Sequence, residues 1–338
     1  MDEDRTLVAG DRLRALPKTH VHLHLDGGYP LEAVQALASR RGRTFVVPPG
    51  FDDVWAFFDA YGTVPALVDT HEDLAELCRA LVHAEAADGV RYLEPAVEPQ
   101  LYADRLGGTE QVLRTVLAAL AEAAADTDTE VGANLTLNTD ADADLADELG
   151  ALAVRFAGAG VTALGTACFD EDGDLTPFVG ATRAARAAGL AVVSHAGQTG
   201  GPSGVAAALD MLGATRIAHG FRAVEDEQVV DRLANEGIVC DVCPVSNVRL
   251  GVVRDLAAHP APVLIARGVP VTLNADDPLW FGASVSDQYA VARDMWGFDD
   301  AALAATAHAG TAATGMSAAT RDRIDRELQS WLAEGQRA

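Results

Sequence analysis

Short runs of apolar residues alternate with longer amphipathic, alanine-rich runs along nearly the whole chain. The short runs have the length of buried strands, and the longer runs have the spacing of helices that cover a sheet. The predicted strands are Thr19–Leu25, Arg91–Val97, Gly132–Asn138, Val161–Phe169, Leu190–His195, Thr215–His219, Ile238–Cys243 and Pro270–Asn274. About eight strands alternating with helices predict an α/β fold, the (β/α)8 TIM barrel.

Two regions add helices to this alternation. Between the first two strands, aromatic residues recur at roughly helical spacing from Phe51 to Tyr61. They either pack against the barrel or form a lid over its mouth, where barrel enzymes build their sites. After Asp299 two further helices are expected on the outside of the barrel. Because no repeat or linker marks a second unit, we predict one barrel domain over residues 1–338.

Composition excludes several classes of function. The 338 residues are 49% hydrophobic and 22% charged, which is globular composition, and 50 acidic against 25 basic residues give a net charge of −25. Such a charge disfavours nucleic acid as a partner. Four cysteines are too few for a disulfide scaffold, and no stretch approaches the roughly 20 apolar residues of a membrane helix. We therefore expect a cytoplasmic protein without a membrane segment.

The first predicted strand carries three histidines, His20, His22 and His24, followed by Asp26. Alternation along a strand would send the three rings to one face, where any two could chelate a metal. One inward histidine is more often a satisfied core residue, but three in one run are costly to bury without a partner. This run therefore indicates a metal site, in which His20 packs or supports the metal ligands.

Further polar residues stand where later strands end. His195 ends the fifth strand, His219 ends the sixth, and the eighth runs into Asp276 and Asp277. In a closed barrel these positions meet at the carboxyl-terminal mouth, where the fold places catalysis. Three imidazoles with one carboxylate suit Zn²⁺, whereas harder metals would want more carboxylates.

Taken together and in order, these motifs resemble the adenosine deaminase family of the amidohydrolase superfamily. The signatures are HxHLDG at residues 22–27, HAG at 195–197, a histidine and glycine at 219–220, CPxSN at 243–247 and DDP at 276–278. The resemblance covers the chain from Pro17 to about Tyr289. It implies hydrolytic deamination of adenosine or a related aminopurine nucleoside or base, which would be the small-molecule partner.

The resemblance also implies a role for each matching residue. One Zn²⁺ per chain would be held by His22, His24, His195 and Asp276. His219 would assist the attacking water as base or electrostatic partner, with Asp276 also in the catalytic set and His24 also near the substrate. The substrate contacts would be Asp277 accepting from the purine N7 side, the backbone N–H of Gly165 toward N3, and Asp26 at the ribose 5′-hydroxyl. Ser246 and Asn247 would either brace their loop or touch the ligand.

The sequence departs from the family pattern at Gln198. Family members have a glutamate here that protonates a ring nitrogen, whereas a glutamine amide donates a hydrogen bond but delivers no proton. General acid catalysis is typically worth about 10² to 10⁴ in rate, so ordinary deamination should be impaired. Three explanations stay open: an engineered Glu→Gln replacement, a natural homologue with another substrate or reaction, or a catalytically weak purine-binding protein.

A smaller departure lies at residues 164–169, which lack the family's Asp-containing run and put the Gly165 contact in doubt.

Two rival metal sites are disfavoured. Another class of zinc deaminase uses H-x-E with P-C-x-x-C, which resembles His83-Ala84-Glu85 and Cys240-Asp241-Val242-Cys243. Here no proline precedes Cys240, and residues three apart on a strand face opposite sides. Binuclear relatives bridge two metals with a carboxylated lysine, but the sole lysine, Lys18, begins the first strand. A mononuclear site is therefore expected.

Overall fold

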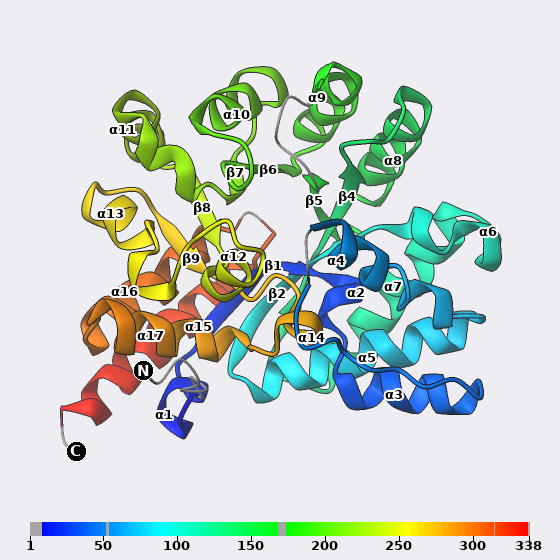
Figure 1. Cartoon of the computed structure of the whole chain (residues 1–338), viewed down its shortest axis with the longest axis horizontal. Coiled ribbons are helices and arrows are strands. Elements are labelled where there is room, and N and C mark those ends of the chain that lie inside the picture. The colour runs from blue at the N-terminus through cyan, green and yellow to red at the C-terminus, as the bar shows by residue number, and fades with distance from the viewer. Residues whose placement is uncertain (1–8, 52–53, 168–173, 314, 337–338) are drawn as a thin grey trace.

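The structure is a computed structural model that describes residues 9–51, 54–167, 174–313 and 315–336. Parallel strands follow one another around a barrel in sequence order, and a ring of helices surrounds them (Figure 1). The barrel strands are β1 (Lys18–His24), β2 (Val90–Val97), β4 (Ala133–Asn138), β5 (Val161–Ala167), β6 (Ala191–Ala196), β7 (Arg216–His219), β8 (Val239–Val242) and β9 (Val271–Leu273). The short β3 (Glu130–Val131) pairs with β2. The predicted TIM barrel and its strands are confirmed, although Cys168 and Phe169 of the predicted fourth strand lie outside the described residues.

The barrel closes between β1 and the segment after β9. The side-chain oxygen of Asn274 accepts from the backbone N–H groups of Val21 and His22, at 2.9 and 3.0 Å. Beyond it, His24 N–H donates to Asp276 O at 3.0 Å and Asp276 N–H donates to His22 O at 3.2 Å. These bonds replace a regular strand ladder and set Asp276 beside the two histidines of β1.

The helices cover the barrel from outside. They are α1 (Asp11–Arg14), α2 (Leu25–Gly28), α3 (Leu31–Arg40), α4 (Val54–Tyr61), α5 (His71–Ala87), α6 (Ala103–Leu106), α7 (Thr109–Ala125), α8 (Ala143–Phe156), α9 (Val179–Ala187), α10 (Pro202–Ala207), α11 (Glu227–Glu236), α12 (Pro244–Arg249), α13 (Ala261–Ala266), α14 (Pro278–Phe281), α15 (Val285–Trp296), α16 (Asp300–Ala309) and α17 (Ala318–Gly335). Short 3₁₀ turns lie at Pro65–Leu67, Pro99–Leu101, Thr176–Phe178, Phe221–Glu225, Leu256–Ala258 and Gly310–Ala312, and a π-helical turn lies at Ala208–Leu212. Within the described residues, no helix combines the length and apolarity needed to cross a membrane.

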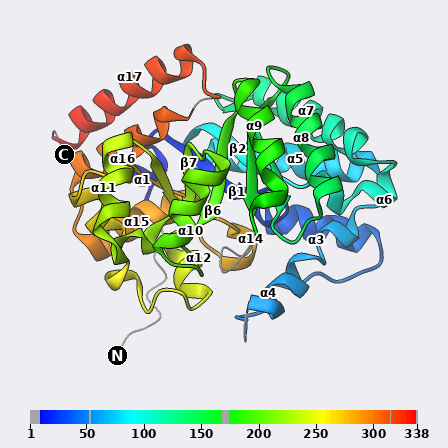
Figure 2. The ribbon, with the colours of Figure 1, turned by 90° about the horizontal axis from the view of Figure 1, so that it is seen from above.

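The two predicted helical additions are present. Between β1 and β2 lie α2, α3, α4 and α5, and α5 begins with a capping box in which Thr70 and Asp73 bond each other's backbone N–H. In Figure 2, α4, α12 and α14 lie toward one side of the molecule and the C-terminal α17 lies toward the opposite side. The loops and short helices that follow the strands thus gather at the mouth, as the fold requires.

A buried ion cluster occupies the barrel interior. The Arg216 guanidinium donates to Glu94 at 2.8 Å, to Asp241 at 2.9 Å and to the backbone oxygen of Val21 at 2.9 Å. All three charged side chains are buried. Because Arg216 neutralises two carboxylates from β2 and β8, it joins strands across the barrel.

Replacing Arg216 with methionine should therefore destabilise the protein. Removal of one partner leaves uncompensated buried charge, which costs about 3 to 5 kcal/mol of unfolding free energy. Urea unfolding of both proteins measures this difference. Arg232→Ala is the control, because Arg232 forms exposed pairs with Asp210 and Glu236 and should change stability by no more than about 1 kcal/mol. Equal effects of the two substitutions would contradict the role assigned to Arg216.

Candidate metal and substrate site

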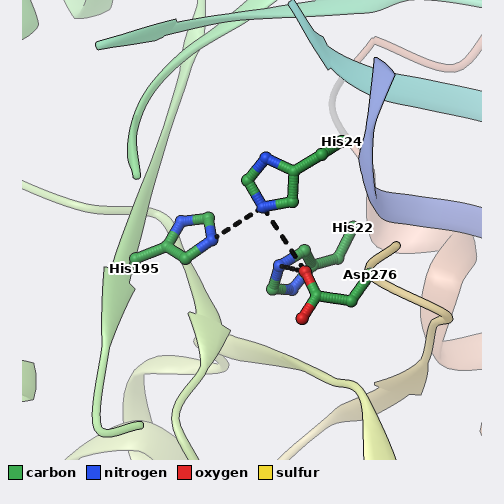
Figure 3. Close-up of side chains that lie close together, drawn as sticks. All are labelled: His22, His24, His195 and Asp276. Atoms are coloured by element: carbon green, nitrogen blue, oxygen red, sulfur yellow. Dashed lines mark hydrogen bonds and ion pairs between the residues drawn. The ribbon is translucent and has the colours of Figure 1, made fainter. Parts of the chain in front are cut away.

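Four side chains converge at the carboxyl ends of the barrel strands (Figure 3). His22 and His24 come from β1, His195 comes from β6, and Asp276 follows β9. One ligating atom of each lies within 4.8 Å of the others. The fold thus brings together the four residues that the resemblance implies as metal ligands.

Hydrogen bonds to backbone carbonyls fix the tautomers of two of these histidines. Nδ1 of His22 lies 2.9 Å from the oxygen of Asp241, and Nδ1 of His195 lies 2.7 Å from the oxygen of Thr166. A carbonyl oxygen only accepts, so each Nδ1 carries the proton and donates it. In the neutral ring, each Nε2 then turns a lone pair toward the cluster, which is the arrangement of metal-binding histidines.

The protonation states also suit metal binding. Burial and the neighbouring imidazoles lower the pKa of His195 well below its ordinary value, so the ring is neutral. Burial alone would raise the pKa of Asp276, but His22 and His24 hold it well below its ordinary value. Ser246 donates its hydroxyl to Asp276 Oδ2 at 2.5 Å, while Oδ1 lies 3.2 Å from His22 Nε2. Burial would lower the pKa of His24, but Asp277 and Asp276 raise it to about 10. His195 and Asp276 therefore offer the deprotonated forms that a metal requires, whereas His24 must give up a proton when a metal binds.

Close approach of acceptor atoms tests whether a cation fits. The Nε2 atoms of His24 and His195 lie 3.2 Å apart. His22 Nε2 is buried and has no hydrogen-bond partner among the described residues. The lone pair of His22 Nε2 faces an Asp276 oxygen at 3.2 Å, and His195 Nε2 turns a second lone pair toward His24. These groups need a positive charge between them, which is either a proton on His24 or a metal ion that replaces it. The residues present therefore fit a divalent metal ion.

A second possible ligand set shares two members with the first. It consists of His22, His219, Cys243 and Asp276, so one ion can use only one of the two sets. Burial raises the pKa of the Cys243 thiol well above its ordinary value, which makes it the poorer ligand. Lys18 lies at the other end of β1, where its ammonium donates to backbone carbonyls. The expected mononuclear arrangement is consistent with this placement.

Two residues of the site have a backbone conformation that side chains disfavour. In the described part of the chain, His219 at φ 70° and Asp276 at φ 63° are the non-glycine residues with positive φ. Residues other than glycine rarely adopt this conformation, and strain of this kind concentrates at functional sites. His219 ends β7 and Asp276 lies three residues after the end of β9, both at the barrel mouth.

His20 does not join its neighbours, contrary to the expectation that all three histidines of the first strand share one face. Its Nδ1 lies 2.7 Å from Glu85 of α5, and its Nε2 accepts from Ala275 N–H at 3.0 Å. The pairing of β1 with β2 shifts register between His20 and Leu23, so regular alternation is interrupted there. His20 instead supports the segment that carries Asp276.

A cavity of about 410 Å³ adjoins the cluster. Its walls are His24, Trp55, Phe57, Phe58, Tyr61, Gly62, Glu98, Leu101, Asn138, Asp140, Ala167, His195, Gln198, Thr199, His219, Leu250, Val252, Asp276 and Asp277. The aromatic residues of α4 thus lie on the cavity, which favours the lid over simple packing against the barrel. Trp55 is 64% exposed at the rim, and the Tyr61 ring lies 6.3 Å from that of His24.

Asp277 places a carboxyl group on the cavity wall. It is buried, and its Oδ1 has no hydrogen-bond partner among the described residues. A Cβ atom at Gly27 would lie 1.8 Å from this oxygen, so only glycine leaves room for it. Burial and the adjacent Asp276 raise the pKa of Asp277 well above its ordinary value. The raised pKa favours the protonated form, which would donate to a ligand, whereas the acceptor role that the resemblance implies needs the ionised form.

The other predicted substrate residues differ in placement. Gln198 and His219 line the cavity. Asp26 and Gly165 are not among its described lining residues: Asp26 is buried and accepts from the Tyr102 hydroxyl. Gly165 lies inside β5, where a Cβ atom would meet the Asn134 side chain at 2.7 Å. At this strand Ala167 reaches the cavity instead.

Glu98 is a cavity residue that the sequence analysis missed. It directly follows β2, is 7% exposed and lines the cavity. Burial, together with the nearby Asp140, raises the pKa of its carboxyl group. The available signal was its position, because a polar residue just after a barrel strand stands at the catalytic face.

Comparison with known proteins agrees with this geometry. The model of the family described as adenosine deaminase matches residues 17–331. A putative adenosine/adenine deaminase of Streptomyces coelicolor is 34% identical over 332 residues, covering 94% of this chain and 97% of that protein. An adenine deaminase of Chelativorans sp. is 36% identical over 297 residues, covering 85% and 90%. The crystal structure of adenine deaminase from Arthrobacter aurescens superimposes with a TM-score of 0.86 at 31% identity, covering 94% and 99%. The chain therefore belongs to the adenosine deaminase family.

Proposed function

We propose that the protein is a zinc-dependent hydrolase that deaminates adenine, adenosine or a related uncharged aminopurine. The observation that carries the proposal is the convergence of His22, His24, His195 and Asp276 beside a largely apolar cavity. Three imidazoles with one carboxylate suit Zn²⁺. When bound, Zn²⁺ lowers the pKa of water from about 15.7 toward 7 and supplies hydroxide at neutral pH.

The chain's own residues bind and orient the purine. A protonated Asp277 donates to a ring nitrogen such as N7, and the aromatic residues of α4 cover the ring and exclude water. Asp276, held by Ser246, has an ionised carboxylate next to the reacting carbon and accepts the proton released by the attacking water. His219 hydrogen-bonds to the same attacking water.

Gln198 limits the final proton transfer. Attack on the amino-bearing carbon places charge on a ring nitrogen, which Gln198 can stabilise by a hydrogen bond from its amide. The proton that Asp276 has accepted from the attacking water must then reach this nitrogen without a side-chain acid at position 198, at a cost in rate. A purine-binding protein with weak turnover is the alternative that this residue favours.

Metal content tests the ligand set. We expect about one Zn²⁺ per chain after dialysis, and His195→Ala should reduce it sharply because it removes one of four ligands. Elemental analysis by mass spectrometry measures both. His71→Ala is the matched control, since His71 is exposed on α5 and should leave the metal content unchanged. Two metals per chain, or full occupancy in His195→Ala, would refute the mononuclear set.

The role of Gln198 is tested by Gln198→Glu. If a general acid is missing, the variant should raise kcat for adenine or adenosine by at least about 10², with unchanged metal content. Steady-state assays compare it with Gln228→Glu, an exposed control on α11. Ordinary turnover by the native chain, with no gain in Gln198→Glu, would mean that the glutamine belongs to another mechanism.

The charges on the cavity predict discrimination against nucleotides. Its described lining contains the carboxylates of Asp140 and Asp276 but no lysine or arginine, and Glu98 and Asp277 are not counted as charges because their pKa values are raised. A 5′-phosphate carries a charge of about −2, and like charges placed together cost several kcal/mol. We expect kcat/KM for AMP to lie at least about 100-fold below that for adenosine.

A charge reversal provides the corresponding variant. Asp140→Lys should raise the AMP to adenosine ratio of kcat/KM by about 10-fold, because it replaces a repulsive charge by an attractive one at an exposed rim position. Asp128→Lys, exposed and outside the cavity lining, should leave the ratio unchanged. A native preference for AMP would contradict the proposed substrate class.

A further inference from the structure

A chain of hydrogen bonds leads from outside the cavity to His219. Asn247 Nδ2 lies 3.3 Å from His219 Nδ1, and Asn247 Oδ1 lies 3.1 Å from His259 Nε2. His259 is not among the described residues that line the cavity. The bonds that connect it to His219 pass through Asn247 and involve none of the four candidate metal ligands. It lies between the rings of Phe221 and Trp296, at 5.3 and 5.6 Å.

The direction of each bond follows from one fixed donor. The backbone N–H of Ala261 donates to His259 Nδ1 at 3.1 Å, so this nitrogen carries no proton. Burial lowers the pKa of His259 to about 3, so the ring is neutral and its proton is on Nε2. The group that faces this N–H must accept, which identifies it as the amide oxygen of Asn247.

The amide then imposes the same direction on His219. With its oxygen toward His259, Asn247 turns its NH₂ group toward His219 Nδ1, which must accept. The opposite amide orientation would set two donors against each other at His259. Asn247 itself is fully buried, and its backbone oxygen accepts from Val252 and Val253, both at 3.0 Å. The His259 side therefore fixes the orientation of the amide, and the backbone bonds hold the residue in place.

We propose that His259 is a positioning residue that, through the Asn247 amide, holds the His219 proton on Nε2. His219 then presents an N–H rather than a lone pair to the cavity. Of the two roles implied by the resemblance, it acts as a hydrogen-bond donor that orients the attacking water and not as a base. This role in the reaction rests on the proposed function, whereas the tautomer does not.

The same tautomer separates the two possible ligand sets. To bind a metal through Nε2, His219 would have to move its proton to Nδ1, opposite the donating amide of Asn247. The set that contains His219 and Cys243 is therefore disfavoured on both of these members. The hydrogen-bond chain therefore favours metal binding by the set that contains His24 and His195 together with His22 and Asp276.

Nuclear magnetic resonance reads the tautomer directly. The full-length chain is labelled with ¹⁵N-histidine, His219 is assigned by the signals lost in His219→Ala, and two-bond ¹H–¹⁵N correlations show which nitrogen is protonated. We expect Nε2–H for His219 in the native protein. Asn247→Asp, nearly identical in shape, removes the donor and should move the His219 proton to Nδ1.

Variants of His259 separate positioning from packing. His259→Phe should give His219 a mixture of tautomers and lower kcat by about 10- to 100-fold, the range for outer-shell partners, with KM within about twofold. His259→Gln keeps a donor and should restore the single tautomer. Trp296→Phe is the packing control: it removes a hydrogen bond to Leu256 beside His259 and should leave the tautomer unchanged.

The proposal is overturned if native His219 carries its proton on Nδ1, or if Asn247→Asp leaves the proton on Nε2. The Asn247→Asp comparison decides the matter even if His259→Phe does not fold. Because the spectra do not depend on turnover, a protein that fails to deaminate but shows the expected tautomers would refute the proposed function and support the bond chain.

Discussion

The repulsion among converging acceptor atoms is the constraint on which the site depends. Ligand atoms of His22, His24, His195 and Asp276 lie within 4.8 Å of one another. The lone pairs of His22 and His195 make this arrangement costly unless a metal ion, or a proton on His24, lies between them. Several features work against relaxation. Backbone carbonyls hold both Nδ1 atoms, Ser246 holds the carboxylate, and Asn274 fastens β1 to the segment after β9. The strained backbone of Asp276 is then a consequence of presenting its side chain at the barrel seam.

The cavity beside this cluster has an aromatic wall on one side and buried carboxyl groups elsewhere. Aromatic rings of α4 form one wall, whereas Glu98 and Asp277 are buried carboxyl groups with raised pKa values. A poorly solvated cavity strengthens each polar contact to a bound ring. A neutral purine gains from this environment, because it brings hydrogen-bonding atoms without a charge that would have to be desolvated. The same reasoning supports the proposed donor role of Asp277 and the expected discrimination against a phosphate.

Sequence patterns predicted the barrel well because hydrophobic periodicity reports local burial. They also predicted the gathering of His22, His24, His195 and Asp276, since strand ends share one face of this fold. Alternation alone placed His20 on the face of His22 and His24, because a register shift in β1 has no signature in the sequence. The supporting role expected for His20 agrees with its bond to Ala275. Glu98 and His259 were missed because their importance comes from neighbours distant in sequence. Protonation states, such as that of Asp277, follow from burial and could not be obtained from residue type.

Deamination in H₂¹⁸O tests the account most directly, because it reports the nucleophile and the bond that breaks in one product. The zinc-loaded chain is incubated with adenine and with adenosine, and the purine product is analysed by mass spectrometry alongside ammonia. The account predicts one ¹⁸O in hypoxanthine or inosine for each ammonia released, and loss of both products after chelation. The result that would contradict it is that neither adenine nor adenosine gives labelled product, even when Zn²⁺ is bound and the Gln198→Glu variant is used.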